Sequence, residues 1–263
     1  KDYLVHVMHV HSGDTEFFST TKARQIQLFN NTARAAGESC IIFTTYHSLE
    51  KIVQSGIDVD TIYFDEAHNS VQRNFFVPTE FYSRYARRCY FFTATPKHSV
   101  TPRKPGMNDS RVYGQVICNV PAPKLVEQGY ILPPVVRLTQ LPQGDFKQSD
   151  SKNLIDTIDD NTASKILIAA RSTKQIVRLV TQSDFTFQLE QRGYNWMYIT
   201  SKTGAIINGQ KVTRHEFFKT LNAWGESDTQ FVIMHHSILS EGINVKGLDA
   251  VLFMRNMDYI GIS

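Results

Sequence analysis

Short apolar runs alternate with segments of helical periodicity along the chain. In the first part, strands are predicted at residues 3–10, 40–44, 61–64 and 89–93, and helices at 21–36 and from about residue 47. In the second part, strands are predicted at 165–169, 196–200, 230–235 and 250–254, and helices at 173–180 and 214–224. Short apolar runs separated by helices indicate parallel sheets with both faces covered.

The composition changes between residues 121 and 151, where five of the nine prolines fall. Stretches rich in proline and glycine are typical of boundaries between domains. We therefore expect a first α/β domain at residues 1–125, a linker at 126–150 and a second α/β domain at 151–263. A length of 263 residues also favours two domains.

Amino-acid composition is that of an ordinary soluble protein and excludes few functions. Hydrophobic residues make up 41% and charged residues 20%, as in ordinary soluble proteins, and the net charge of +3 permits a nucleic-acid partner without arguing for one. No apolar run approaches the roughly 18 residues that a membrane span needs, so no membrane partner is expected. Cys40, Cys89 and Cys118 lie far apart and are predicted to be reduced and buried, which favours the cytoplasm or another reducing compartment.

Two carboxylates end the apolar run within "YFDEAHNS", residues 63–70. Ligands of open parallel sheets bind beyond the carboxyl ends of the strands, which is where Asp65 and Glu66 fall. Asp65 could hold Mg²⁺, which takes oxygen ligands and bridges to phosphates, and Glu66 could orient or deprotonate a water molecule. The alternative for a bare Asp-Glu pair is a solvated acidic turn.

A second apolar strand ends in hydroxyl side chains within "FFTATP", residues 91–96. Thr93 lies 28 residues after Asp65, which leaves room for one crossover helix. Adjacent strands would bring Thr93 and Thr95 beside Asp65 and His68, where hydroxyls could bond the carboxylate and the imidazole. The alternative for Thr-Ala-Thr alone is a plain turn.

These two elements together resemble the DEAH-box, superfamily-two helicases and translocases. Asp65-Glu66-Ala67-His68 matches motif II of that family, and Thr93-Ala94-Thr95 matches motif III. The resemblance implies two tandem RecA-like domains that bind ATP and Mg²⁺ between them. It also implies that Asp65 holds the metal and that Glu66 activates water, while His68, Thr93 and Thr95 couple hydrolysis to movement.

The second domain adds a further match, because "SILSEGINV" at residues 237–245 resembles motif V. The resemblance implies that Glu241, Gly242 and Asn244 approach ATP or nucleic acid. Three other stretches resemble loops that contact the phosphate backbone: "IIFTTYHSL", "ILIAARST" and "YITSKTG". They give Thr44, Thr45, Ser172, Thr200 and Ser201 as expected nucleic-acid contacts.

The stretch after motif III, "RVYGQVI" followed by "KLVEQGYILPP", resembles the repair, phage and type III restriction branch of the family. This likeness favours DNA over RNA as the partner. It also implies a nuclease or methylase partner domain or subunit, and the cytoplasm of a bacterial or phage-infected cell.

The family's phosphate-binding loop, G-x-x-x-x-G-K-[ST], does not occur in the chain. The one partial match, "GAIINGQK" at residues 204–211, has Gln210 where the lysine belongs and lies downstream of motif II, so we predict a flexible loop there. The arginines of motif VI are also absent. Truncation at both ends explains these absences, and natural loss of catalysis is the competing account.

Two expectations follow for activity. We expect a fragment of an ATP-dependent DNA helicase or translocase, and we expect this chain by itself not to hydrolyse ATP, because the phosphate-binding lysine and the arginines supply much of the charge stabilisation in phosphoryl transfer. The alternative is a non-catalytic nucleic-acid-binding module or scaffold with a degenerate helicase core.

Three histidines and three arginines could suggest a metal site or a phosphate site, but other interpretations are favoured. His6, His9 and His11 could suggest a metal site, but ligands from one strand converge poorly because alternate side chains point to opposite faces. Arg84, Arg87 and Arg88 are read mainly as a solvated helix end, with phosphate contact as the alternative.

Overall fold

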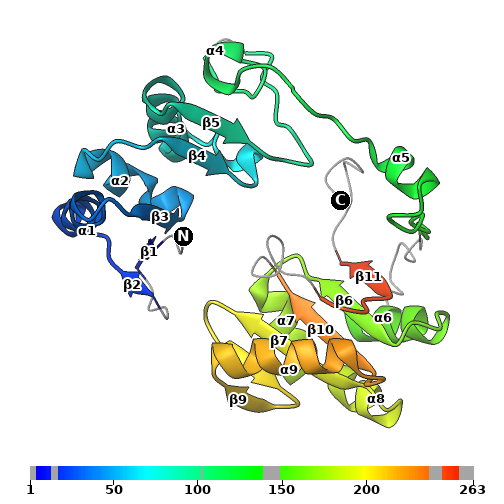
Figure 1. Ribbon diagram of the computed structural model, residues 1–263. Coiled ribbons are helices and arrows are strands. Elements are labelled where there is room, and N and C mark those ends of the chain that lie inside the picture. Colours follow the sequence, from blue (N-terminus) through cyan, green and yellow to red (C-terminus); the bar gives the residue numbers. More distant parts are fainter. Residues whose placement is uncertain (1–3, 13–16, 102, 139–148, 237–244, 255–263) are drawn as a thin grey trace. The chain divides into compact units, whose positions relative to one another are not determined.

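The computed structural model describes residues 4–12, 17–101, 103–138, 149–236 and 245–254. The chain divides into two compact units, Lys1–Pro133 and Pro134–Ser263, and each has its own sheets and core. Both units combine helices with parallel strands (Figure 1). The expected fold class, α/β with parallel sheets, is therefore confirmed.

The described residues of the first unit form two parallel sheets, one of three strands and one of two. β1 (Val5–Val10) lies between β2 (Phe18–Ser19) and β3 (Ser39–Thr44), and β4 (Thr61–Phe64) pairs with β5 (Arg88–Phe91). The register of β4 and β5 sets Phe64 opposite Phe91, so the carboxyl ends of these two strands are level.

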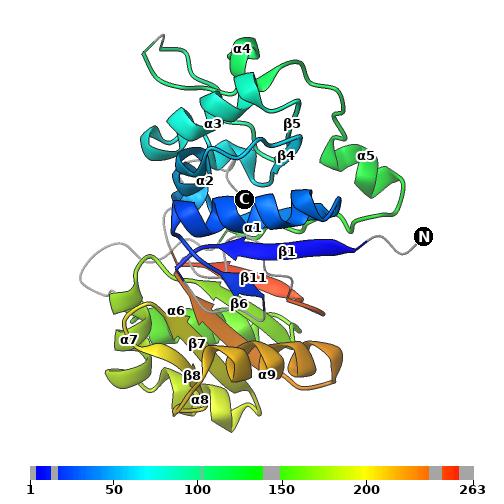
Figure 2. The same ribbon diagram turned by 60° about the vertical axis from the view of Figure 1, so that its left-hand side comes forward.

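Three helices pack on the inner face of these strands. They are α1 (Ala23–Ala35), α2 (Leu49–Ser55), which follows the 3₁₀ turn η1 (Tyr46–Ser48), and α3 (Arg73–Tyr85). Figure 2 shows α1 lying along β1. Buried apolar side chains from strands and helices form one core there, which includes Met8, Ile26, Ile52, Phe64 and Tyr82.

The opposite face of the same strands is exposed. Because side chains alternate along a strand, the neighbours of the core residues point to this outer face. Ile41, Phe43, Tyr63 and Phe92 there have exposed fractions of 46%, 57%, 67% and 53%. The expectation that helices cover both faces is therefore wrong for the described part of the first unit.

The second unit contains a six-stranded sheet in the order β11-β6-β10-β7-β8-β9. The first four strands in this order are parallel, and β8 and β9 add an antiparallel edge. The bounds are β6 (Lys165–Ala169), β7 (Asn195–Thr200), β8 (Gly204–Ile207), β9 (Gln210–Val212), β10 (Phe231–His235) and β11 (Ala250–Phe253).

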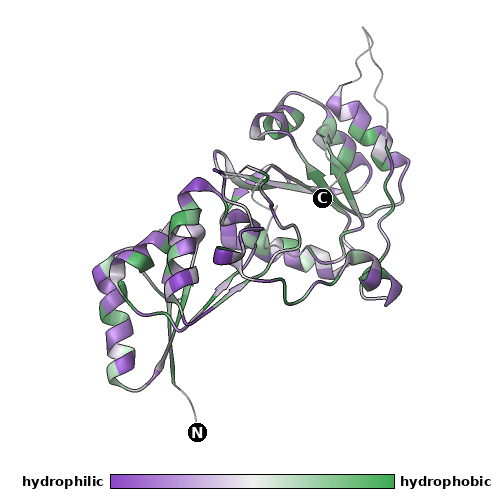
Figure 3. Cartoon of the chain, turned by 90° about the horizontal axis from the view of Figure 1, so that it is seen from above, coloured by the Kyte–Doolittle hydropathy of each residue, from purple (hydrophilic) through white to green (hydrophobic). Residues whose placement is uncertain are grey.

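Helices cover both faces of the six-stranded sheet of the second unit. α6 (Asp150–Asp159), α7 (Thr173–Thr181) and α8 (Phe185–Gln191) pack around one core, and α9 (Arg214–Glu226) packs around another. Hydrophobic and hydrophilic residues alternate along the helices, as amphipathic helices require (Figure 3). The short helices α4 (Ser110–Tyr113) and α5 (Ala122–Glu127) belong to the first unit.

Residues 204–211 form a β-hairpin, so the prediction of a flexible loop was wrong. Asn208 and Gly209 both have positive φ, 44° and 79°, as a two-residue type I′ turn requires. The Asn208 side chain secures the turn: its Oδ1 accepts a hydrogen bond from the Trp196 N–H, and its Nδ2 donates to Asn195 Oδ1, each at 2.8 Å. The sequence signal was the Asn-Gly pair itself, which is typical of a type I′ turn.

The three cysteines are free thiols, as expected, but they are not all buried. Cys40 and Cys89 are half-buried, whereas Cys118 is exposed, so the prediction of burial was wrong for Cys118. Burial raises the pKa of the Cys89 thiol to about 12, which keeps it protonated at neutral pH.

No helix among the described residues is long and apolar enough to span a lipid bilayer.

Candidate functional site

Asp65 lies directly beyond the carboxyl end of β4. Phe64, the last residue of the strand, is buried, and the exposed Asp65 follows it. Asp65 Oδ1 accepts a hydrogen bond from the Glu66 N–H at 2.9 Å, and the Tyr46 hydroxyl donates to the Asp65 carbonyl at 2.8 Å. The second carboxylate oxygen has no hydrogen-bond partner among the described residues, so it is available to a cation.

Glu66 turns the chain away from the strand. Its φ of 46° and ψ of 48° lie in the left-handed region, which is rare outside glycine, asparagine and aspartate. The 3₁₀ turn η2 (Ala67–Asn69) follows at once, and the Ala67 N–H donates to the Phe92 carbonyl at 2.8 Å. This bond fixes the turn after β4 to the end of β5.

His68 is the centre of a polar cluster that joins the two predicted motifs. Its side chain is almost buried, and Nδ1 lies 3.0 Å from Thr93 Oγ1, 3.5 Å from Thr95 Oγ1 and 3.4 Å from Glu66 Oε2. The Thr95 N–H donates to Thr93 Oγ1 at 3.1 Å, which holds that hydroxyl in place. The structure thus brings together Glu66, His68, Thr93 and Thr95.

A second layer of hydrogen bonds lies behind η2. Ser70, fully buried, donates its hydroxyl proton to the Ala67 carbonyl at 2.6 Å. A serine has one hydroxyl proton, so the 2.9 Å bond between Ser70 Oγ and Tyr113 Oη must be donated by Tyr113. Burial raises the pKa of Tyr113, which keeps this donor protonated. The sequence pattern did not predict a role for either residue, because the bond depends on tertiary packing.

The predicted backbone contacts of the first unit lie at the same edge as Asp65. Thr44 ends β3 and donates its hydroxyl proton to the carbonyl of Val10 or Thr45, each at 3.2 Å. The exposed Thr45 follows, and Tyr46 then bonds the Asp65 carbonyl. The carboxyl ends of β3 and β4 are therefore linked through Tyr46.

The predicted contacts of the second unit also gather at the carboxyl ends of parallel strands. Ser172 follows β6 and caps α7, where its hydroxyl accepts a hydrogen bond from the Gln175 N–H at 3.2 Å. Thr200 ends β7, is 4% exposed and bonds Thr203 Oγ1 at 2.6 Å. Ser201 is exposed, so at this position the serine is the more accessible hydroxyl.

The motif V residues Glu241, Gly242 and Asn244 lie outside the described residues, and their role stays a prediction. Within the described ranges, no group of three or more histidine, cysteine, aspartate or glutamate side chains could hold a metal ion. A single carboxylate at Asp65 fits a Mg²⁺ that takes its other ligands from substrate phosphates and water.

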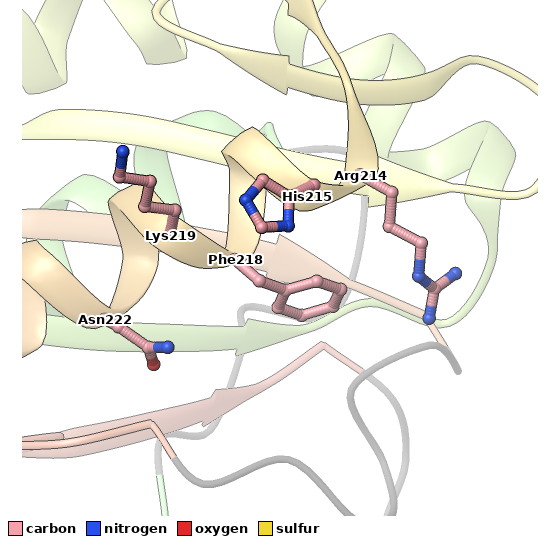
Figure 4. A pocket seen from close by; sticks show the side chains of 5 residues that line it. All are labelled: Arg214, His215, Phe218, Lys219 and Asn222. Atoms are coloured by element: carbon pink, nitrogen blue, oxygen red, sulfur yellow. The ribbon is translucent and has the colours of Figure 1, made fainter. Parts of the chain in front are cut away.

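An open hollow on α9 was not anticipated from the sequence. It is lined by Arg214, His215, Phe218, Lys219 and Asn222 (Figure 4). The Arg214 guanidinium lies over the Phe218 ring at 5.3 Å from its centroid, a cation–π contact. The spacing of these residues on one helix face was the available signal, and Arg214 and Lys219 are the cationic side chains among them.

Comparison with known proteins informs the fold. No protein-family model matches the chain, and no curated protein matches it by sequence. A solved structure that it does resemble is the ATP-dependent Type ISP restriction-modification enzyme LlaBIII bound to DNA, with a TM-score of 0.64 and 16% sequence identity. The match covers 95% of this chain and 20% of that enzyme, so the chain spans about a fifth of its length. At this identity the likeness shows the fold alone, and it agrees with two tandem RecA-like domains.

Proposed function

We propose that this chain belongs to an ATP-dependent, helicase-like enzyme that moves along nucleic acid, with DNA favoured over RNA. The observation that carries the proposal is the cluster around His68, which connects the acidic turn after β4 to the hydroxyl turn after β5. The fold it shares with an ATP-dependent enzyme bound to DNA supports the same assignment.

The acidic turn would serve the chemistry of ATP. Asp65 would ligate Mg²⁺ through its open carboxylate oxygen, and the metal would neutralise charge on the phosphates. Glu66 would accept a proton from the attacking water or orient it. Its left-handed backbone conformation ends the strand, so the residue lies in the turn beyond β4. Glu241, Gly242 and Asn244 complete the proposed nucleotide contacts.

The hydroxyl turn would report the state of the nucleotide. Thr93 Oγ1 contacts His68 Nδ1 and accepts a hydrogen bond from the Thr95 N–H. His68 also contacts Glu66, so a movement of Glu66 on nucleotide binding would shift the imidazole and with it Thr93. Such a relay between two strand ends would couple hydrolysis to movement on a strand bound at Thr44, Thr45, Ser172, Thr200 and Ser201. A nuclease or methylase partner, domain or subunit, remains part of the proposal.

The test is a pair of isosteric substitutions in the intact protein. Glu66→Gln keeps size and hydrogen bonding but removes the base, so we expect ATP and DNA binding to survive while turnover falls by roughly 10²–10⁴. Asp65→Asn weakens the Mg²⁺ ligand, so we expect nucleotide binding itself to become poor. Steady-state ATPase rates and equilibrium nucleotide binding measure the difference.

Asp58→Asn is the matched control, because this exposed carboxylate pairs with Arg34 away from the turn. It should leave both quantities unchanged. Wild-type turnover in Glu66→Gln would remove the catalytic assignment and favour a nucleic-acid-binding scaffold instead.

A further inference from the structure

A loop with four basic side chains follows the hydroxyl turn. Its described residues are 97–101 and 103–107, and we call them the basic loop. Lys97 lies two residues after Thr95, so the loop begins at the same strand end as the His68 cluster. Lys97, His98, Arg103 and Lys104 are all exposed. No carboxylate occurs in the basic loop.

The base of the basic loop is closed by hydrogen bonds. The Met107 N–H donates to the Lys97 carbonyl at 2.8 Å. Asn108 bridges to Ser99 twice: its Oδ1 accepts from the Ser99 N–H at 2.8 Å, and its Nδ2 donates to the Ser99 carbonyl at 3.0 Å. Gly106 packs so closely that a Cβ would lie 2.4 Å from the Ser99 nitrogen. The loop therefore presents its cations from a defined base.

The cations of the basic loop are not neutralised by the protein. Lys97, Arg103 and Lys104 form no ion pair with a carboxylate in the part of the chain that the structure describes. Neighbouring arginines differ: Arg84 pairs with Glu80 at 2.6 Å, and Arg111 pairs with Asp109 at 2.8 Å. Even the acid nearest the loop in sequence, Asp109, is thus already occupied.

We propose that the basic loop binds the phosphodiester backbone of nucleic acid through Lys97, Arg103 and Lys104. This inference rests on the proposed function and adds a contact surface to it. Cations spread over an exposed loop fit a repeating polyanion, whereas a single triphosphate is held by a compact cradle of backbone amides. Lysine and arginine side chains that bind phosphates do not read base edges, so we expect the contact to be independent of base sequence.

The test is the salt dependence of DNA binding by the intact protein. Each phosphate contact contributes about 0.7 to the slope of log K against log salt for a single strand. The triple variant Lys97→Gln, Arg103→Gln, Lys104→Gln should therefore bind a labelled oligonucleotide more weakly at low salt, with a slope reduced by about 2. Nucleotide affinity should stay unchanged.

Arg84→Gln is the matched control, since it removes an exposed cation that Glu80 already pairs. It should leave the slope unaltered, and circular dichroism should show that all variants are folded. If the wild-type protein does not bind DNA, the proposed function fails. If the triple variant keeps the wild-type slope of log K against log salt, the basic loop does not contact DNA. Loss of nucleotide affinity with the DNA slope intact would assign the loop to ATP instead and overturn the proposal.

Discussion

At the scale of single residues, the candidate site depends on one strained backbone position. Glu66 is one of only two non-glycine residues with positive φ among the described residues, and such conformations cost roughly 1–3 kcal/mol at functional sites. Here the left-handed turn lets Ala67 bond the end of β5 while His68 points to Thr93. The surrounding hydrogen bonds hold that conformation, and the buried Ser70 and the half-buried Tyr113 are part of this support.

Tyr113→Phe tests this support, because it removes one hydroxyl and keeps the ring that packs on Phe91. Ser70 then loses its donor, so we expect the first unit to be destabilised by about 0.5–1.5 kcal/mol. Urea unfolding followed by fluorescence gives the change. Tyr130→Phe is the control, since Tyr130 is 75% exposed and its hydroxyl bonds none of the described residues. Equal stabilities of the two variants would contradict the buttressing role.

At the scale of elements, the β8–β9 hairpin depends on Gly209. Its φ of 79° is unfavourable for a residue with a Cβ, so Gly209→Ala should destabilise the second unit by about 1 kcal/mol. Gln210→Ala changes an exposed neighbour and should stay within about 0.5 kcal/mol of the wild type. Denaturant midpoints would measure both. An unperturbed Gly209→Ala variant would mean that the turn does not need its left-handed geometry.

The longer parallel strands were predicted because each is a short apolar run, whereas β2, β8 and β9 were not predicted. β4 and β6 begin and end where predicted, and β5 ends two residues earlier than expected, since Phe92 and Thr93 already belong to the turn. The hairpin was missed despite its Asn-Gly pair, because Gln210 and Lys211 make β9 too polar for a strand pattern. α6 was missed because its apolar residues, Leu154, Ile155 and Ile158, are few in a polar segment next to the linker.

The arrangement of the candidate site was predicted in part, because it follows from the order of the strands. Parallel pairing of β4 with β5 follows from one crossover helix, and it brings His68 to Thr93 as expected. The Ser70–Tyr113 bond joins residues 43 apart through tertiary packing of α4, which no local pattern encodes. The cationic hollow on α9 was missed because a solvated helix face carries the same residues.

At the scale of the whole molecule, each unit has its own core, and acid should destabilise the second unit through one hydrogen-bonded carboxylate, Asp249. In the second unit, burial alone would raise the pKa of Asp249, but hydrogen bonds from Ser164 and from the Lys165 N–H hold it below its usual value. A lowered pKa stabilises the fold above the unfolded value, roughly pH 3.9, and this contribution is lost as pH falls through the folded value.

Asp249→Asn should therefore lower the melting temperature of the second unit at pH 7, and the difference from the wild type should shrink as pH falls through the lowered pKa of the folded state. Calorimetry across this range measures it. Asp228→Asn is the control, because that exposed aspartate has no ion pair among the described residues. A difference for Asp249→Asn that does not depend on pH would show that its charge is irrelevant to folding.

The bare outer face of the first unit has a practical consequence for the colloidal behaviour of the protein. Ile41 and Phe43 on β3, Tyr63 on β4 and Phe92 just beyond β5 present apolar surface to water, and exposed apolar surface favours association. Attraction between copies through this face will grow with concentration. Sulfate and phosphate salts will strengthen it, because they favour burial of apolar surface. Crystallisation and storage should therefore avoid salting-out conditions.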